Sequence, residues 1–151
     1  MRYGDIMKIE AVRIGDRYGP EYEKYLEEKL PEHEFIWVRE PIREDVLLQW
    51  NKMHGMSLDI DEPICVIDID ILLVNNYKEL FDFPIKKGQF LSIPGWWRDT
   101  EKKRYKINGG FFKYYPKDCR YIYDKFMSDP DLWQNYYIKR GIARGPGNGE
   151  Q

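Results

Sequence analysis

Two aspartates, Asp68 and Asp70, stand one residue apart in an otherwise apolar segment, ICVIDIDILLV at residues 64–74. The β-branched run predicts a central strand that is covered on both faces. A buried carboxylate without a partner is costly in free energy, so both aspartates need partners. At the carboxyl end of a strand, a divalent metal that carries a phosphorylated ligand would be a suitable partner for both carboxylates. Two carboxylate ligands favour Mn²⁺ or Mg²⁺ over zinc. The alternative is that they pair with lysines or cap the next turn.

The segments before the aspartates alternate between strand and helix patterns. Residues 9–14 and 34–39 predict short strands, and residues 15–19 predict a loop after the first strand. Apolar residues recur at helical spacing after Pro20 and again over residues 46–55. This order of elements predicts right-handed crossovers and a mainly parallel sheet. The expected fold class is therefore α/β.

The second half of the chain continues the mixed pattern. Residues 89–93 are followed by a loop, 94–98, that carries Trp97 and Arg98. A further strand is predicted over 106–115, interrupted by Asn108-Gly109-Gly110. Apolar stripes predict helices over 119–127 and 130–137, and the glycine-rich residues 141–151 predict a mobile loop.

The composition indicates one folded domain spanning residues 1–151. The chain is 42% hydrophobic and 16% aromatic, which excludes a disordered chain. Its formal net charge of -2 leaves no positive field to collect nucleic acid or an acidic membrane. Two cysteines are too few for a disulfide framework or a thiolate zinc site. With no signal-peptide core and no apolar run that could span a bilayer, the sequence predicts a cytoplasmic protein; no feature specifies its oligomeric state.

These motifs resemble those of glycosyltransferases of the GT-A fold. The stretch CVIDIDILLVNNYKELFDF at 65–83 looks like the apolar strand, DxD motif and following turn of that class. The residues INGGFF at 107–112 are similar to the N-G-G-F or N-S-G-V strand of glycogenin-like, family-8-type enzymes. The residues GDRY at 15–18 resemble the loop that holds the nucleotide base. The resemblance covers residues 9–151 and extends to small viral-type glycosyltransferases.

The resemblance implies a three-layer α/β/α sandwich and a metal-dependent transfer reaction. A sugar would pass from a nucleotide-diphosphate donor, usually a UDP-sugar, to a hydroxyl of a glycan or protein acceptor. Asp68 and Asp70 would hold Mn²⁺ or Mg²⁺, which neutralises the leaving diphosphate. A retaining outcome is the expectation for family-8-type enzymes.

Two loops receive donor-binding roles from the same resemblance. Tyr18 would stack on the base, while Asp16 or the adjacent backbone at Gly15 would hold the edge of the base. Trp97 would stack on sugar C–H surfaces, and Arg98 would reach phosphate or acceptor. The alternative for Tyr18 is a partly buried anchor, and for the tryptophan a core-filling ring.

The interrupted strand receives a catalytic role. Asn108 would contact the sugar, and Gly109 and Gly110 would let the backbone approach the sugar hydroxyls closely, because glycine has no Cβ. The alternative is an ordinary β-bulge. Lys52 precedes the DxD strand and could approach the diphosphate, but a helix lysine is expected to be solvated.

One departure from the family pattern concerns the C-terminal end. Family-8-type enzymes continue past a D-Q or E-Q element, represented here by Gly149-Glu150-Gln151, into a segment that supplies a metal-ligating His and a Lys for the diphosphate. Neither His33 nor His54 occupies the matching position. We therefore expect either a C-terminally truncated domain or a metal site completed by water and ligand phosphates.

Two other functions stay open at this point. In a DxD phosphatase of the haloacid-dehalogenase type, Asp68 would be the nucleophile and Asp70 the general acid. That motif normally sits on the first strand and is followed by a phosphate-binding turn, whereas Ile71-Leu72-Leu73 offers no such turn. The second alternative is a non-catalytic domain that binds a nucleotide sugar or acts as an interaction module.

Overall fold

The computed structural model describes residues 6–94 and 107–139, which form an α/β fold around one mixed sheet. The strand order is β2-β1-β3-β5-β4. The strands are β1 (Lys8–Val12), β2 (Glu34–Val38), β3 (Ile64–Ile67), β4 (Phe90–Pro94) and β5 (Ile107–Tyr114). The helices are α1 (Pro20–Lys29), the 3₁₀ helix η1 (Leu48–Ser57), α2 (Tyr77–Asp82), α3 (Pro116–Ser128) and α4 (Pro130–Lys139). The predicted fold class is confirmed.

The sheet has a parallel half and an antiparallel half. Strand β1 pairs in parallel with both β2 and β3, whereas β5 runs antiparallel to β3 and β4. The prediction of a mainly parallel sheet is therefore right only for the first three strands. Strands β4 and β5 are neighbours in both sequence and sheet, and the regular strand–helix alternation that produces parallel pairing ends at β3.

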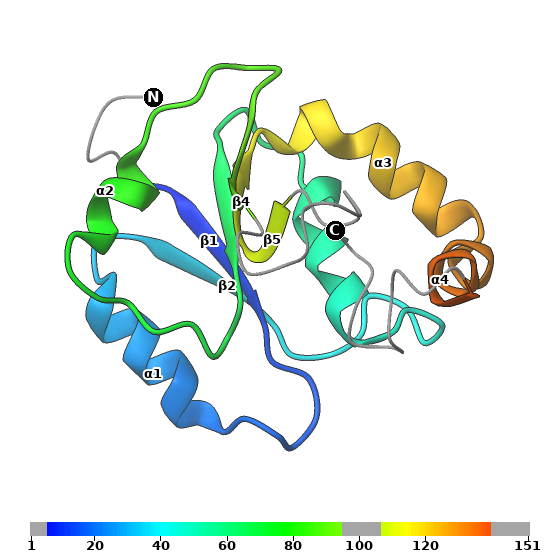
Figure 1. The fold of residues 1–151 in the computed structure, drawn as a ribbon, viewed down its shortest axis with the longest axis horizontal. Helices are drawn as coiled ribbons and strands as arrows, with labels where there is room; N and C mark the ends of the chain where they lie inside the picture. The colour runs from blue at the N-terminus through cyan, green and yellow to red at the C-terminus, as the bar shows by residue number, and fades with distance from the viewer. Residues whose placement is uncertain (1–5, 95–106, 140–151) are drawn as a thin grey trace.

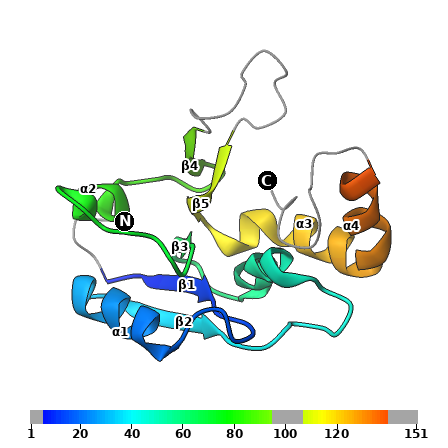
Figure 2. The same ribbon diagram turned by 60° about the horizontal axis from the view of Figure 1, so that its bottom comes forward.

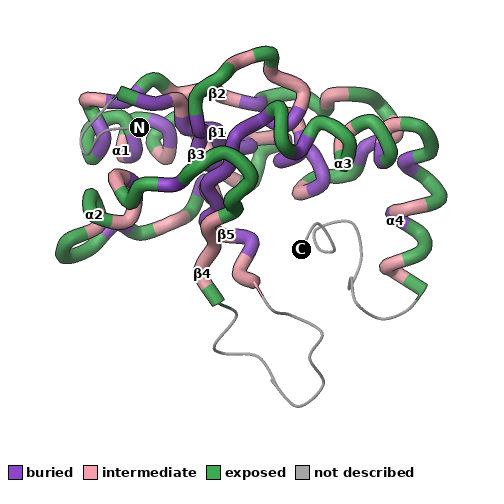
Figure 3. Tube along the Cα trace, turned by 90° about the horizontal axis from the view of Figure 1, so that it is seen from above, coloured by how far each residue is buried: buried purple, intermediate pink, exposed green. Residues whose placement is uncertain are grey.

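Helices cover both faces of the sheet. Leu26 and Leu30 from the α1 segment and Phe81 from α2 pack on one face, against Ile9, Ala11 and Ile67 among others. Helices η1 and α3 pack on the other face, where α4 also contributes (Figure 1). Buried residues concentrate along β1 and β3, as Figure 3 shows. The two layers of helices therefore leave the strand ends, rather than the sheet faces, accessible to a ligand.

The strand predicted over residues 64–74 is wrong in its length. Strand β3 ends at Ile67, so both aspartates follow the strand instead of lying within it. Residues 68–71 make a turn, in which the Ile71 amide donates to the Asp68 carbonyl over 3.4 Å. The apolar residues beyond the turn have other uses: Ile69 and Leu73 are buried in the core on the α1 and α2 side. Their burial in a loop explains why an apolar run imitated a longer strand.

The helix predicted over residues 46–55 is a 3₁₀ helix that begins at Leu48. Asn51, fully buried, replaces part of the local backbone hydrogen bonding: its Oδ1 accepts from the Ile42 amide, and its Nδ2 donates to the carbonyls of Val46 and Leu48. Such side-chain bonds to the backbone compete with regular α-helical pairing. Helical periodicity alone could not distinguish the two helix types.

Helices α1 and α4 begin at the predicted prolines, Pro20 and Pro130, whereas α3 begins at Pro116, three residues before the predicted helix over 119–127. Proline suits this position because its missing N–H is not needed in the first turn. The short helix α2 was not predicted. No helix among the described residues is long and apolar enough to cross a membrane.

Candidate functional site

The candidate site lies where the carboxyl ends of β1 and β3 meet. The chain leaves β1 toward β2 on one side and later returns to form β3 on the other side. The crossover through α1 uses one face of the sheet and the passage through η1 uses the opposite face (Figures 1 and 2). The β1–β3 boundary is therefore a topological switch point, the place where open α/β sheets bind ligands.

Asp68 is the first residue beyond β3 and lies against the start of β5. Its backbone amide donates to the Gly110 carbonyl over 3.1 Å, which extends the pairing of the two strands by one residue. Its side chain is 35% exposed, so it remains accessible from solvent. The carboxylate that the sequence pattern placed in a buried strand therefore lies just beyond the strand and is partly exposed.

Lys52 is the partner of Asp68. The ammonium Nζ lies 2.5 Å from Asp68 Oδ1 and donates to the Gly109 carbonyl over 2.8 Å, and the lysine side chain is only 3% exposed. The expectation of a solvated lysine is wrong, because the tight 3₁₀ helix turns residue 52 toward the sheet. From the sequence, Lys52 was only a weak candidate for a phosphate contact, although its place between Trp50 and Met53 of the apolar stripe was a signal that it could be buried.

Asn108, Gly109 and Gly110 lie beside Asp68. Asn108 Oδ1 accepts from the Gly110 amide over 2.8 Å. A Cβ added at Gly110 would stand 3.2 Å from Asp68 Oδ2 and 3.1 Å from Asn108 Oδ1. A side chain at residue 110 would therefore crowd both of these groups, which would have to shift by a few tenths of an ångström. The register between β4 and β5 shifts after Ser92 and resumes at Ile93 and Asn108, so the predicted interruption of the strand is present.

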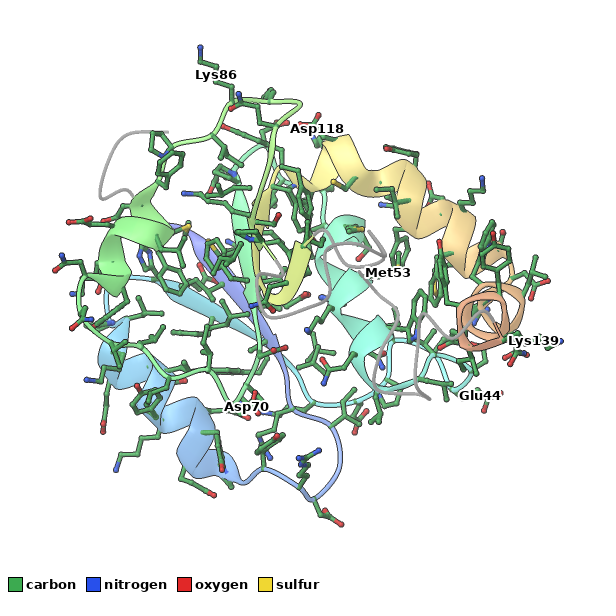
Figure 4. All side chains as sticks on the ribbon, in the orientation of Figure 1. Glu44, Met53, Asp70, Lys86, Asp118 and Lys139 are labelled. Carbon is green, nitrogen blue, oxygen red and sulfur yellow. The ribbon has the colours of Figure 1, made fainter. Side chains whose placement is uncertain are left out.

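Asp70 is exposed, and its Oδ2 accepts from the Tyr18 hydroxyl over 2.9 Å (Figure 4). This bond joins the loop after β1 to the turn after β3, 52 positions apart. It also raises the pKa of the Tyr18 phenol above its ordinary value of 10, because the neighbouring carboxylate disfavours a phenolate. The structure thus brings together two residues that the sequence separates widely.

The loop after β1 is held by an ion-pair cluster. Gly15 has a φ of +83°, a conformation that glycine adopts readily. Glu23 on α1 pairs with both Arg13 and Arg39, and these cations lower the pKa of its carboxyl. The Tyr18 ring packs edge-on against Tyr22 at 4.8 Å between centroids. Tyr18 is therefore anchored at its ring and at its hydroxyl, whereas the exposed Asp16 makes no side-chain hydrogen bond within the described part of the chain.

The carboxylate pair has the oxygen ligands that Mn²⁺ or Mg²⁺ prefers, but it is a small set. Among residues 6–94 and 107–139, no group of three or more His, Cys, Asp or Glu side chains could hold a metal ion. Mg²⁺ is commonly held by one or two carboxylates together with substrate phosphates and water. Asp68 and Asp70 supply two carboxylates, the number with which Mg²⁺ is held when substrate phosphates and water complete its coordination.

The remaining predicted positions divide into two groups. Trp97, Arg98 and the Gly149-Glu150-Gln151 element lie outside the described residues. His33 accepts a hydrogen bond from the Met7 amide, and His54 pairs with Glu10 over 2.7 Å.

Comparisons with known proteins identify no relative. No protein-family model, no curated protein and no solved structure matches the chain. The case for a function consequently rests on the arrangement of the residues themselves.

Proposed function

We propose that the chain is a GT-A-like glycosyltransferase domain that transfers a sugar from a nucleotide-diphosphate donor to a hydroxyl acceptor. The observation that carries the proposal is the convergence of three motifs at the switch point. The DxD turn, the Asn-Gly-Gly segment and the loop ending in Tyr18 are far apart in sequence but are joined by direct hydrogen bonds. The parallel strands β2, β1 and β3 and the helices on both faces are compatible with this architecture.

The charges at the site suit a diphosphate. A divalent metal bound with the donor would supply Lewis-acid stabilisation of the departing diphosphate. Asp68 and Asp70 would hold that metal. Lys52 orients Asp68 through the ion pair and adds a positive charge beside it, at a location that solvent barely reaches. A preorganised cation of this kind stabilises negative charge without reorganising during the reaction.

The backbone around Asn108 would position the sugar. Gly110 has no Cβ beside Asp68 and Asn108, so sugar hydroxyls can approach the carboxylate and the Asn108 amide. The Tyr18 ring lies on the opposite side of the DxD turn, where a base could stack against it. The donor would thus lie across the β1–β3 boundary, with its base toward the first loop and its sugar toward β5.

Isothermal titration with UDP and GDP tests the donor site. The experiment compares wild type, Asp70→Asn and the matched control Asp131→Asn, each with and without Mn²⁺. Asp131 is an exposed acid on α4. We expect binding that needs Mn²⁺, is unchanged in the control and is lost in Asp70→Asn. A folded wild type that binds neither nucleotide would contradict the proposal.

Further measurements separate the alternatives. Release of sugar from a UDP-sugar with an added acceptor would establish transfer, whereas Mn²⁺-dependent affinity without turnover would indicate a binding domain. A trapped aspartyl phosphate that disappears in Asp68→Asn would instead establish the phosphatase chemistry. The ring of Tyr18 is tested by comparing Tyr18→Phe with Tyr18→Ala: base stacking predicts that the phenylalanine variant keeps UDP affinity and the alanine variant loses it.

A further inference from the structure

Glu10 is a buried carboxyl group that the proposed donor site does not use. It lies on β1 and is fully buried, and its partners in the adjacent strands are the apolar Ile36 and Val66. Its Oε1 lies 2.7 Å from His54 Nδ1, and its carboxylate also accepts a hydrogen bond from the Gly55 amide. A buried carboxyl group is costly in free energy unless it is hydrogen-bonded. These two bonds therefore tie the end of η1 to β1.

The end of η1 lies directly on the sheet at this point. A Cβ added at Gly55 would stand 2.5 Å from Ile64 Cδ1 and 2.7 Å from the Tyr114 hydroxyl oxygen. In a 3₁₀ helix, side chains three residues apart eclipse one another. Lys52 and Gly55 have this spacing in η1, and both are buried against the sheet. The contact between Gly55 and Glu10 therefore fixes the face of η1 from which the Lys52 ammonium projects.

The Lys52 ammonium, which is ion-paired with Asp68, also interacts electrostatically with Glu10. An ionised Glu10 is thus a second carboxylate within range of this ammonium, and it attracts the ammonium away from Asp68. A neutral Glu10 leaves Asp68 as the stronger partner. The charge on Glu10 therefore changes the forces on the cation of the proposed donor site.

The pair of Glu10 and His54 can exchange protons with solvent. The His54 side chain is 32% exposed and lines a cavity of about 510 Å³, whose other charged or titratable groups are Arg39, Glu40 and Tyr123. Burial raises the pKa of Glu10 to about 7, and the hydrogen bond to Glu10 raises the pKa of His54. The pair therefore loses charge-neutralising protons as pH rises through about 7.

The remaining groups that face Glu10 stay neutral in this range of pH. The Tyr114 hydroxyl of β5 is buried, and burial raises its pKa well above its ordinary value of 10. Cys119 of α3 lies within electrostatic range of Tyr114, and burial raises the pKa of its thiol to about 11. Among the described residues, His54 and Lys52 are therefore the groups whose charge acts on Glu10 near neutral pH.

We propose that Glu10 and His54 are positioning residues for the Lys52 ammonium, and that the charge of this buried pair controls the affinity of the donor site. This inference rests on the proposed function and adds regulation by pH to the same site. With Glu10 neutral, or ionised beside a protonated His54, Lys52 stays on Asp68 and donor affinity is high. When the pair has lost both protons, the buried anion competes for Lys52 and weakens the hold of β1 on η1, so donor affinity falls.

The first test measures Lys52 directly and needs no nucleotide. NMR of the ¹⁵N-labelled chain follows the Lys52 ammonium from about pH 6 to pH 8.5 in wild type, Glu10→Gln and the matched control Glu40→Gln. Glu40 is an exposed acid that lines the His54 cavity. Glutamine at residue 10 keeps an oxygen that accepts from His54 but does not titrate. We expect an inflection near pH 7 in wild type and control that is absent from Glu10→Gln.

A second variant keeps the test decisive should Glu10→Gln fail to fold. His54→Phe keeps a ring but removes the hydrogen bond that lowers the pKa of Glu10. The inflection of the Lys52 signal should therefore move to higher pH in this variant. A Lys52 signal without an inflection in wild type, or with the same inflection in wild type and in the folded variant, overturns the inference.

Isothermal titration of UDP with Mn²⁺ on the same samples measures the consequence for the donor. Circular dichroism first establishes that each sample is folded at both pH values used. We expect affinity about five- to tenfold lower at pH 8.5 than at pH 6.5 in wild type and Glu40→Gln, and a change below about twofold in Glu10→Gln. Any effect of pH on the nucleotide itself is common to all three chains.

The two measurements distinguish the two proposals. If wild type binds UDP and all three chains share one pH dependence, the positioning inference is overturned and the proposed function stands. If a folded wild type does not bind UDP while its Lys52 signal still follows Glu10, the proposed function is overturned, and with it the control of donor affinity.

Discussion

Replacing Glu10 by glutamine should remove a pH dependence from the stability of the fold. Glu10 lies on β1, is fully buried, and pairs with His54 on η1 over 2.7 Å. Its second oxygen, Oε2, has no hydrogen-bond partner among the described residues, and neither has the nearby Tyr114 hydroxyl. Burial raises the pKa of Glu10 from 4.5 to about 7, against the opposing effects of His54, the Gly55 amide and Lys52.

The size of the effect follows from that pKa. Because the folded state holds the proton more tightly than the unfolded state, the contribution is fully present at low pH and is lost as pH rises from 4.5 through 7. The hydrogen bond to Glu10 also raises the pKa of His54. The stability that His54 contributes to the folded state is therefore also lost as pH rises through this raised pKa. For Glu10 alone, we expect the free energy of unfolding to fall by about 2 to 3 kcal/mol between pH 5 and pH 8.

Urea denaturation followed by circular dichroism at pH 5, 6, 7 and 8 measures this loss. Glutamine keeps the size of the side chain and an oxygen that accepts from His54, but it does not titrate. The Glu10→Gln variant should therefore lose most of the slope, whereas Glu40→Gln, an exposed control, should follow wild type. A variant whose stability depends on pH as steeply as that of wild type would refute the reasoning.

Other predictions concern single contacts. Lys113 is fully buried and donates to two carbonyls at the end of α2 over 2.6 and 2.8 Å. Chemical denaturation of Lys113→Met should therefore show a free energy of unfolding about 2 to 3 kcal/mol lower than that of wild type. A decrease below about 0.5 kcal/mol would contradict this prediction. Gly110→Ala should crowd Asp68 and weaken UDP–Mn²⁺ binding while the melting temperature changes little, as titration and thermal scans can compare. Burial raises the pKa of Cys65 to about 12 and that of Cys119 to about 11, so both thiols should react slowly with a disulfide reagent until urea is added. Rapid labelling of the native chain at neutral pH would show that the sites open.

Local sequence patterns were sufficient to predict much of the fold. The strands β1 and β2, the helices that begin with proline, and the α/β class all follow from periodicity and from residues with strong backbone preferences. The aspartate pair and the Asn-Gly-Gly segment were also visible, because polar or glycine residues inside apolar strands need a special explanation. The same reasoning overextended β3 to residue 74, since apolar residues buried in a loop have the composition of a strand.

Tertiary structure decided which of these residues meet. Lys52 pairs with Asp68, Tyr18 with Asp70 and Glu10 with His54, and each pair depends on the order and register of the strands. Sequence alone determined that the chain carries a strand–helix scaffold and two carboxylates in need of partners. It could not determine the partners, because a contact between residues that are 16 to 52 positions apart is set by how the elements pack.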